Sequence, residues 1–353
     1  MKQRALIIKL GAIGDVLMAI PAVYALHLQG AEIDWVCGTL VAPILACYPW
    51  IRTIILDDRA LIHGGAAAKL KSLSPVWRQL ARQRYDLCAT LYYDSRYKLI
   101  ALPVRAGRKI LLSRTNRALM LLPGRHHTDE YARILLGQED GQRPMALSPV
   151  KAEVLPASPL VRIDGLSRVV IASAGARNMM RDDALRRWPV ESYAVVAREL
   201  IERGIEVVLI GGPDDVWATP YFDGFGVTNL IGRLSLVETL ALLDEADAML
   251  THDTGPLHLA GITRVGIVSI FGPTDPRGRL PQRADCVAIW GGEGFACRPC
   301  YDGRDYAPCK ENGCMRQVTP ELVLREVEAV MDQRRSSSRP PRVVTPESTV
   351  TTR

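Results

Sequence analysis

The residues best suited to chemistry in this chain follow apolar runs that have the character of buried strands. Asp253 comes after such a run and opens the sequence Asp-Thr-Gly-Pro-Leu-His, which ends at His258. Gly255 lets the backbone approach a ligand closely, and Pro256 suits the first turn of a helix whose free N–H groups attract phosphate oxygens. The pattern predicts a diphosphate-binding turn that includes Thr254. An ordinary strand–turn–helix with a capping Asp is the alternative.

A second carboxylate, Asp15, closes the turn Gly11-Ala12-Ile13-Gly14 after the first apolar run of the chain. A carboxylate in this position is suited to act as a general base. It would take the proton of a substrate hydroxyl that acts as a nucleophile. The alternative is structural, with Asp15 capping a helix that begins at Val16. The turn is not the dinucleotide fingerprint, because it lacks the G-x-G-x-x-G spacing.

A departing diphosphate needs stabilisation as its negative charge grows. No Asp-x-Asp pair follows a predicted strand, so we expect stabilisation without a catalytic metal, by helix N-terminal amides and by the cation Arg186. An ordinary surface arginine before a helix is the alternative for Arg186. Asp214 or Asp215 is placed as a ribose ligand, Leu234 as a wall of the adenine pocket, and Gly175 as a further part of the donor site.

Four cysteines stand apart from the others in a loop-like stretch with the spacing C-x₂-C-x₈-C-x₄-C: Cys297, Cys300, Cys309 and Cys314. Four thiolates at such spacing can hold a structural zinc or iron ion. Reduced thiols that only pack are an equal alternative, and disulfides are disfavoured in a reducing cytoplasm.

The elements around these residues alternate between strands and helices, which predicts mostly parallel sheets in an α/β fold. The predicted strands are 5–9, 32–37, 53–56, 87–91, a weaker one near 109–112, 169–172, 206–210, 248–250 and 266–271. The main predicted helices are 16–28, 66–84, 190–203, 236–245, 256–262 and 320–331. A proline-rich stretch near 148–167 predicts a boundary between domains at 1–155 and 156–332, followed by a disordered tail at 333–353.

Composition and charge narrow the class of protein. The chain has 353 residues, 48% of them hydrophobic and 23% charged, with a net charge of +6. It has no apolar run of the ~18–20 residues that a membrane span requires and no signal-peptide pattern, so we expect a cytoplasmic protein. Residues 95–128 hold eight basic and no acidic side chains, a composition that suits a polyanion or an anionic membrane surface. A solvated face is the alternative, and no motif indicates nucleic-acid binding.

Five segments occur in the order of a known family: 6–22, 186–193, 209–215, 230–236, and 253–260 together with 271–276. They resemble glycosyltransferase family 9, whose best-known members are ADP-heptose:lipopolysaccharide heptosyltransferases. The resemblance implies a GT-B arrangement, in which two Rossmann-like domains face each other across a cleft. It also implies that Asp15 is the catalytic carboxylate and that Asp253 contacts the heptose or its nucleotide. The family usually has Lys where this chain has Arg186, and many members have a cysteine-rich patch.

The resemblance further implies an inverting transfer of heptose from ADP-L-glycero-D-manno-heptose to a lipopolysaccharide inner-core acceptor, peripheral to the inner face of the inner membrane. The N-terminal domain would then hold the acceptor through Arg96, Arg105, Arg108 and Lys109. No cofactor is expected for catalysis. The alternatives are a nucleotide-sugar epimerase of GT-B architecture, a protein O-heptosyltransferase of the same family, and a binder without catalytic activity.

Overall fold

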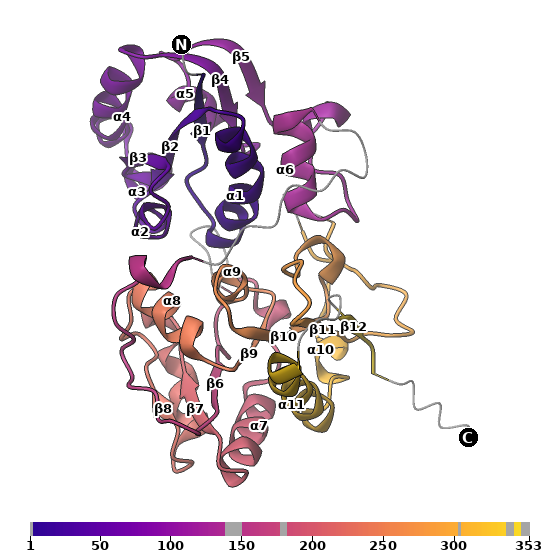
Figure 1. The fold of residues 1–353 in the computed structure, drawn as a ribbon. Helices are drawn as coiled ribbons and strands as arrows, with labels where there is room; N and C mark the ends of the chain where they lie inside the picture. Colours follow the sequence, from indigo (N-terminus) through magenta and orange to yellow (C-terminus); the bar gives the residue numbers. More distant parts are fainter. Residues whose placement is uncertain (1–2, 138–149, 177–181, 303–304, 337–341, 347–353) are drawn as a thin grey trace. The chain divides into compact units, whose positions relative to one another are not determined.

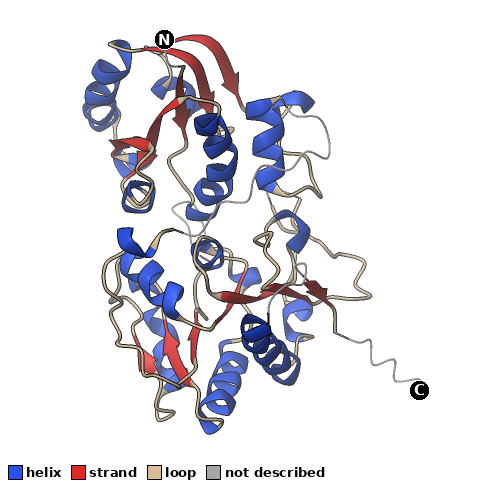
Figure 2. Ribbon diagram, viewed as in Figure 1, coloured by secondary structure: helices blue, strands red, loops and turns tan. Residues whose placement is uncertain are grey.

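A computed structural model describes residues 3–137, 150–176, 182–302, 305–336 and 342–346. The chain divides into two compact units, Met1–Ser148 and Pro149–Arg353. Each unit is an α/β structure whose sheet contains only parallel strand pairs (Figures 1 and 2).

The N-terminal unit has a five-stranded sheet in the order β3-β2-β1-β4-β5. Its strands are β1 (Arg4–Ile8), β2 (Glu32–Gly38), β3 (Ile51–Leu56), β4 (Arg84–Thr90) and β5 (Arg105–Leu111). Its helices are α1 (Ile13–Leu28), α2 (Ala42–Ala46), α3 (Asp58–His63), α4 (Ala66–Ala81), α5 (Ser95–Ile100) and α6 (His127–Leu136), with a short 3₁₀ turn η1 (Arg117–Leu119).

Alternation along β1 divides the apolar side chains of this unit between two faces. Leu6 and Ile8 belong to a buried cluster with residues of α4 and α5, such as Leu80 and Ile100. Successive strand side chains point to opposite faces, so Ile7 points to the other side of the sheet. Helices α1 and α6 pack against each other, apart from α4 (Figure 1). Burial on both faces explains why β1 is entirely apolar after Arg4, whereas the edge strand β5 carries exposed basic residues.

The C-terminal unit has a seven-stranded sheet in the order β12-β11-β10-β9-β6-β7-β8. Its strands are β6 (Arg168–Ile171), β7 (Glu206–Leu209), β8 (Thr228–Asn229), β9 (Ala248–His252), β10 (Gly266–Phe271), β11 (Cys286–Trp290) and β12 (Arg342–Val344). Its helices are α7 (Val190–Glu202), α8 (Leu236–Glu245), α9 (Gly255–Gly261), α10 (Gly313–Arg316) and α11 (Pro320–Ser336). The 3₁₀ segments are η2 (Ala152–Val154), η3 (Ala184–Arg186), η4 (Pro213–Phe222) and η5 (Pro276–Gly278).

In both units the strand order reverses beside the first strand of the unit. The reversal lies between β1 and β4 in the N-terminal unit and between β6 and β9 in the C-terminal unit. Open α/β sheets bind their ligands at such a point, outside the carboxyl ends of the strands. The two turns that carry Asp15 and Asp253 follow β1 and β9, so each stands at the reversal point of its own sheet.

The structure differs from the sequence-based expectations in several elements. Strand β11 and helix α6 were not predicted, and α1 begins at Ile13 and continues through Pro21, where a kink or restart was expected. Within the predicted disordered tail, α11 continues to Ser336, and Arg342–Val344 form β12, which pairs with β11. No helix in the described part of the chain is long and apolar enough to cross a membrane.

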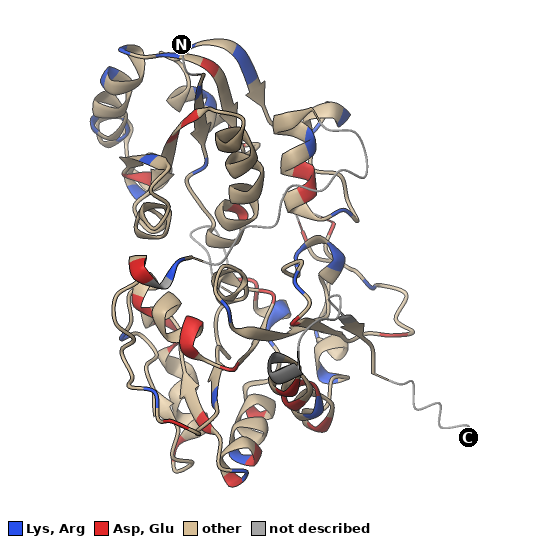
Figure 3. Ribbon diagram, viewed as in Figure 1, with Lys and Arg blue, Asp and Glu red and all other residues tan. Residues whose placement is uncertain are grey.

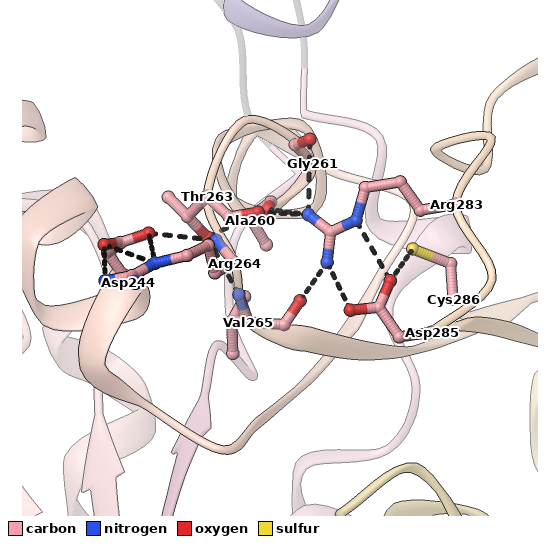
Figure 4. Close-up of polar contacts among 9 residues, drawn as sticks. All are labelled: Asp244, Ala260, Gly261, Thr263, Arg264, Val265, Arg283, Asp285 and Cys286. Atoms are coloured by element: carbon pink, nitrogen blue, oxygen red, sulfur yellow. Dashed lines mark hydrogen bonds and ion pairs between the residues drawn. The ribbon is translucent and has the colours of Figure 1, made fainter. Parts of the chain in front are cut away.

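The amino-terminal ends of β10 and β11 are held by a group of arginine contacts (Figure 4). Arg283 donates to the carbonyl oxygens of Ala260 and Gly261, at 3.2 and 3.4 Å, and also to those of Thr263 and Val265. Its guanidinium also pairs with Asp285 at 2.8 Å. Arg283 therefore donates to carbonyls at and after the end of α9, in addition to the hydrogen bonds that Thr263 donates to the Ala260 carbonyl.

Candidate active site

The candidate base Asp15 lies in the first turn of α1 and is not its N-cap. The N-cap is Ala12, which has no side-chain hydrogen bond, so the alternative in which Asp15 caps a helix starting at Val16 is wrong. The side chain of Asp15 is 29% exposed, and its Oδ2 lies 3.0 Å from Nζ of Lys9. Asp15 is therefore reachable from solvent while an ion pair holds it.

Lys9 is the element that orients Asp15, and sequence reasoning did not identify it. Its ammonium is fully buried and lies 4.5 Å from the centre of the Tyr92 ring, which follows β4. The backbone around Lys9 is fixed by two buried side chains. Trp35 Nε1 donates to the Lys9 carbonyl at 3.1 Å, and the Tyr97 hydroxyl accepts from the Leu10 N–H at 3.1 Å. The sequence signal that could have found Lys9 is a lysine directly after an apolar strand, where charged side chains are rare.

The predicted donor-site turns meet at the reversal point of the C-terminal sheet. Gly175 follows β6 and Thr254 follows β9, and a Cβ atom at Gly175 would lie only 3.0 Å from Thr254 Oγ1. A side chain at position 175 would push these two turns apart, so the close approach requires glycine. The helix that follows Thr254, α9, has only seven residues.

Asp253 is the centre of the charged group at this point. It is 1% exposed and forms ion pairs with Arg186, at 3.6 Å, and with Arg279, at 3.7 Å. Burial alone would raise the pKa of Asp253, but Arg279, Arg186 and His258 outweigh burial and lower it to about 2. Asp253 is therefore ionised at neutral pH. Arg279, which comes from the loop after β10, was not predicted.

These charges are paired but not saturated with hydrogen bonds. Neither carboxylate oxygen of Asp253 has a hydrogen-bond partner among the described residues, and neither does Nε of Arg186. The other end of Arg186 donates to Asp183 at 2.7 Å. Buried polar atoms normally have partners, so unmet acceptors beside an unmet donor are suited to a ligand that carries both hydroxyl groups and anionic oxygens.

A buried histidine next to Asp253 was also missed. His252 Nδ1 accepts from the Tyr193 hydroxyl at 3.0 Å, and its Nε2 donates to the Gly175 carbonyl. Burial lowers the pKa of His252 to about 4, an effect that Arg186 and Arg187 reinforce and the Gly175 hydrogen bond opposes. His252 is therefore neutral at pH 7, and its hydrogen bond to the Gly175 carbonyl holds the Gly175 turn in place.

The remaining donor-site candidates lie around η4 and the turn after β8. Asp215 Oδ2 accepts from the Gly212 N–H at 2.8 Å and lies 3.9 Å from the position of a Cβ at Gly175. Asp214 is exposed, so Asp215 is the nearer of the two to the Gly175 turn. Leu234 is half-buried in the turn before α8. The ribose and adenine roles of these residues stay predictions.

The structure separates the four predicted acceptor residues. Arg96 lies just after the carboxyl end of β4 and pairs with Asp94 at 2.5 Å. Arg105 begins the edge strand β5 opposite Arg84, whereas Leu111 at the other end of β5 pairs with Thr90. The strands are parallel, so Arg105 lies at the end of the sheet opposite the Asp15 turn.

Arg108 and Lys109 are exposed between these two ends, on the strand that Figure 3 shows with blue bands. Another residue of the basic stretch lies nearer to the carboxyl edge. The Arg114 guanidinium lies 4.8 Å from the centre of the Tyr93 ring, which follows β4. The placement gives Arg105, Arg108 and Lys109 no position beside Asp15, and their acceptor role stays a prediction.

The four clustered cysteines do not fit a preformed metal site. Within the part of the chain that the structure describes, no three His, Cys, Asp or Glu side chains are grouped so that they could hold a metal ion. All four thiols are free, and Cys297 and Cys309 are exposed. Burial raises the pKa of the Cys314 thiol to about 11, and the neighbouring Cys300 and Cys309 add to the shift. No step below involves a metal at these residues.

Comparison with known proteins agrees with this geometry. Residues 167–310 match the family model for glycosyltransferase family 9 (heptosyltransferase), the part of the chain that includes Gly175, Arg186 and Asp253. Lipopolysaccharide heptosyltransferase 1 of Pseudomonas aeruginosa is 25% identical over 93% of this chain and 98% of its own. The lipopolysaccharide core heptosyltransferase OpsX of Haemophilus influenzae is 23% identical over 78% of this chain and 80% of its own. The predicted resemblance to glycosyltransferase family 9 is confirmed.

Solved structures agree in fold with this chain. A glycosyl transferase of family 9 from Veillonella parvula has a TM-score of 0.73 at 20% identity and covers 94% of this chain and 97% of its own. The E. coli heptosyltransferase WaaC, solved with ADP, has a TM-score of 0.68 at 20% identity and covers 93% and 100%. The predicted α/β fold of the GT-B type, with two parallel sheets, is confirmed, as is the prediction that the chain is a glycosyltransferase.

Proposed function

We propose that this family 9 glycosyltransferase is an inverting heptosyltransferase that uses ADP-heptose as donor and a lipopolysaccharide inner-core sugar as acceptor. The observation that carries the proposal is the buried Asp253 between Arg186 and Arg279, with hydrogen-bond capacity left over on Asp253 and Arg186. Relatives named as lipopolysaccharide heptosyltransferases support the choice of donor and acceptor class.

In this proposal Asp15 is the general base. The Lys9 ammonium, at 3.0 Å, holds one oxygen of the Asp15 carboxylate, and the turn before α1 leaves the side chain partly exposed. The carboxylate takes the proton of the acceptor hydroxyl as that oxygen attacks the anomeric carbon of the heptose. The bond from the anomeric carbon to the diphosphate breaks on the opposite face, so the configuration inverts and ADP leaves.

The leaving ADP carries its new charge on the β-phosphate, where two cations stabilise it. Arg186 has an unpartnered buried Nε, and both arginines sit beyond hydrogen-bond distance from Asp253. Each arginine can donate to a phosphate oxygen while it stays beside Asp253, so the buried carboxylate keeps its two counter-charges. Asp253 then accepts hydrogen bonds from hydroxyl groups of the donor. In this account no metal bridges the phosphates.

The acceptor and the membrane surface are assigned to the basic stretch of the N-terminal unit. Arg108 and Lys109 are exposed on the edge strand, and Arg96 and Arg114 lie nearer to the Asp15 edge of the sheet. We infer that the latter pair faces the phosphates of an inner-core acceptor. Arg105, Arg108 and Lys109 face the anionic leaflet, where each cation contributes about 1 kcal/mol.

The test is transfer of heptose by the purified protein and by Asp15→Asn. The amide keeps the shape of the side chain but accepts no proton, so kcat should fall by about 10²–10⁴ while donor affinity stays near that of wild type. Asp57→Asn is the matched control, because Asp57 is the N-cap of α3 in the same unit and should leave kcat unchanged.

Three results would contradict the proposal. Transfer by Asp15→Asn within threefold of wild type would remove Asp15 as the base. An isomerised donor would indicate an epimerase. Heptose found on a protein and never on a lipopolysaccharide core would assign the other acceptor class.

A further inference from the structure

Two tyrosines from the cysteine-rich segment are paired across the loop that follows β11. Tyr301 and Tyr306 form an antiparallel backbone bridge, and their ring centres are 4.8 Å apart. The Ala307 N–H donates to the Cys300 carbonyl at 3.1 Å, next to this pair. We call Tyr301 and Tyr306 the tyrosine bridge.

The tyrosine bridge is attached to the carboxyl edge of the C-terminal sheet, where Asp253 lies. The Tyr301 N–H donates to the carbonyl of Pro273, in the loop after β10, at 3.1 Å. The Arg279 guanidinium lies 5.6 Å from the centre of the Tyr301 ring and 3.7 Å from Asp253. One face of Arg279 is thus set against an aromatic ring while its edge reaches the buried carboxylate.

Tyr306 belongs to the same electrostatic neighbourhood. Burial raises the pKa of Tyr306, the nearby Arg186 opposes the shift, and Asp183 and Asp253 add to it. Its phenol therefore stays protonated at neutral pH. Beyond the bridge, Asn312 Nδ2 donates to the Arg187 carbonyl at 3.3 Å, so the segment is tied to the donor-site chain at that end too.

We propose that the tyrosine bridge is a wall of the donor site that recognises the sugar-diphosphate end of the nucleotide sugar. Tyr301 holds Arg279 in place for the diphosphate, and Tyr306 stands beside Arg186 and Asp253. The proposal rests on the function proposed above and adds to it the residues that select for the glycosyl end.

The unmet polar atoms at this place fit that chemistry. The buried Asp253 oxygens need hydrogen-bond donors, which sugar hydroxyls supply, and Nε of Arg186 needs an acceptor, which a phosphate oxygen supplies. A guanidinium held over an aromatic ring presents its N–H groups in the plane of the guanidinium, where a phosphate oxygen can accept from them. The nucleoside end is assigned to the turns after β7 and β8, so it should not depend on the tyrosine bridge.

The experiment measures equilibrium binding of ADP-heptose, ADP and AMP to the full chain and to Tyr301→Leu and Tyr306→Phe. Phe295→Leu is the matched control, because Phe295 is an exposed aromatic residue of the same segment. We expect Tyr301→Leu to weaken ADP-heptose and ADP about tenfold, the size of one misplaced charge-assisted contact. Tyr306→Phe should weaken ADP-heptose about threefold to tenfold by the loss of one hydroxyl. AMP affinity should change less than twofold in either variant, and Phe295→Leu should bind all three ligands as wild type does.

The outcomes separate this inference from the proposed function. Wild-type affinity for ADP-heptose in both tyrosine variants would overturn the tyrosine bridge as a recognition wall and leave the heptosyltransferase proposal standing. Binding of a different nucleoside-diphosphate sugar by wild type, weakened in the variants, would support the bridge and overturn the choice of heptose. Equal loss of AMP and ADP-heptose would show a general disruption of the site and overturn the inference. Tyr306→Phe keeps the ring, so it guards against a folding defect in Tyr301→Leu.

Discussion

The two ends of the seven-stranded sheet use buried arginines in opposite ways. At the amino-terminal end, the Nε, NH1 and NH2 groups of Arg283 all donate, to Asp285 and to four backbone carbonyls (Figure 4). At the carboxyl end, Arg186 has a buried Nε without a partner and reaches Asp253 only at 3.6 Å. Both side chains are mostly buried, with exposed fractions of 21% and 14%.

An arginine whose N–H groups all donate within the protein stabilises the fold, whereas an arginine with an unmet N–H group is suited to bind a ligand. A saturated guanidinium compensates its own desolvation and satisfies chain ends that would otherwise be unpaired. An unsaturated one leaves the cost of burial partly uncompensated in the free protein, and a ligand with anionic oxygens removes that cost. We therefore expect substitution of Arg283 to lower mainly stability and substitution of Arg186 to lower mainly donor affinity.

The largest expected effect is on Arg283→Met. The substitution keeps an aliphatic chain but removes the Arg283 donors from Asp285 and from the carbonyls of Gly261, Thr263 and Val265, while the Ala260 carbonyl still accepts from Thr263, so the free energy of unfolding should fall by about 2–4 kcal/mol. Denaturant unfolding measures the loss, and donor affinity of the folded protein should stay near wild type.

Arg186→Met is the partner variant for that measurement. It leaves the buried Asp183 and Asp253 without one of their cations, although Arg279 still pairs with Asp253, so the free energy of unfolding should fall by about 1–2 kcal/mol, less than for Arg283→Met, while donor affinity should fall by about 10- to 100-fold. A stability loss as large as that of Arg283→Met would contradict the contrast between the two ends.

Sequence reasoning found the parts of the site that follow directly from strand ends. Asp15 and Asp253 each follow an apolar run, and in a parallel sheet the carboxyl end of a strand is where ligands bind. Gly175 and Thr254 could be predicted for the same reason, because they stand at turns after β6 and β9. The apolar run in β9 covers only residues 248–250, so the α/β class followed from the alternation of strands and helices along the chain and not from any one run.

The residues that sequence reasoning missed act through contacts between distant parts of the chain. Arg279 meets Asp253 from the loop after β10, and Lys9 meets Asp15 only because the turn between them folds back. His252 reads as the last residue of a strand, and only its bonds to Tyr193 and Gly175 give it a role. The basic residues of β5 did not indicate that Arg105 lies at the end of the sheet opposite Asp15, because that position depends on the register and direction of the strand.

The next prediction uses His252 to test whether water reaches the buried side chains at the carboxyl end of the C-terminal sheet. Its pKa falls from 6.5 to about 4 on folding, so between these values the unfolded chain binds a proton that the folded protein does not. The contribution of His252 to the free energy of unfolding is complete above pH 6.5. It decreases as the pH falls toward 4, by about 3 kcal/mol in all. Denaturant unfolding at intervals between pH 7 and 4 measures the slope.

His252→Asn should flatten that slope, since Asn does not titrate in this range. His63→Asn, at an exposed position of α3, is the matched control and should leave the slope unchanged. An equal slope in wild type and His252→Asn would mean that water reaches this histidine, and that the carboxyl end is no drier than the surface.

The smallest expected effect concerns Arg264, which tests whether burial or hydrogen-bond number sets the contribution of an arginine. Arg264 lies at the same amino-terminal end as Arg283 and pairs with Asp244 through Nε and NH2, the shortest contact being 2.6 Å. Its side chain is 58% exposed, so water replaces much of what the carboxylate supplies. Arg264→Leu should therefore lower the free energy of unfolding by less than about 1 kcal/mol. Asp244 keeps the backbone N–H of residue 264 as a donor in the variant, because that bond does not depend on the side chain. A loss equal to that of Arg283→Met would mean that exposure to water does not reduce what an ion-paired arginine contributes, because Arg264 makes fewer hydrogen bonds than Arg283. Burial would then not explain the difference between Arg283 and Arg186.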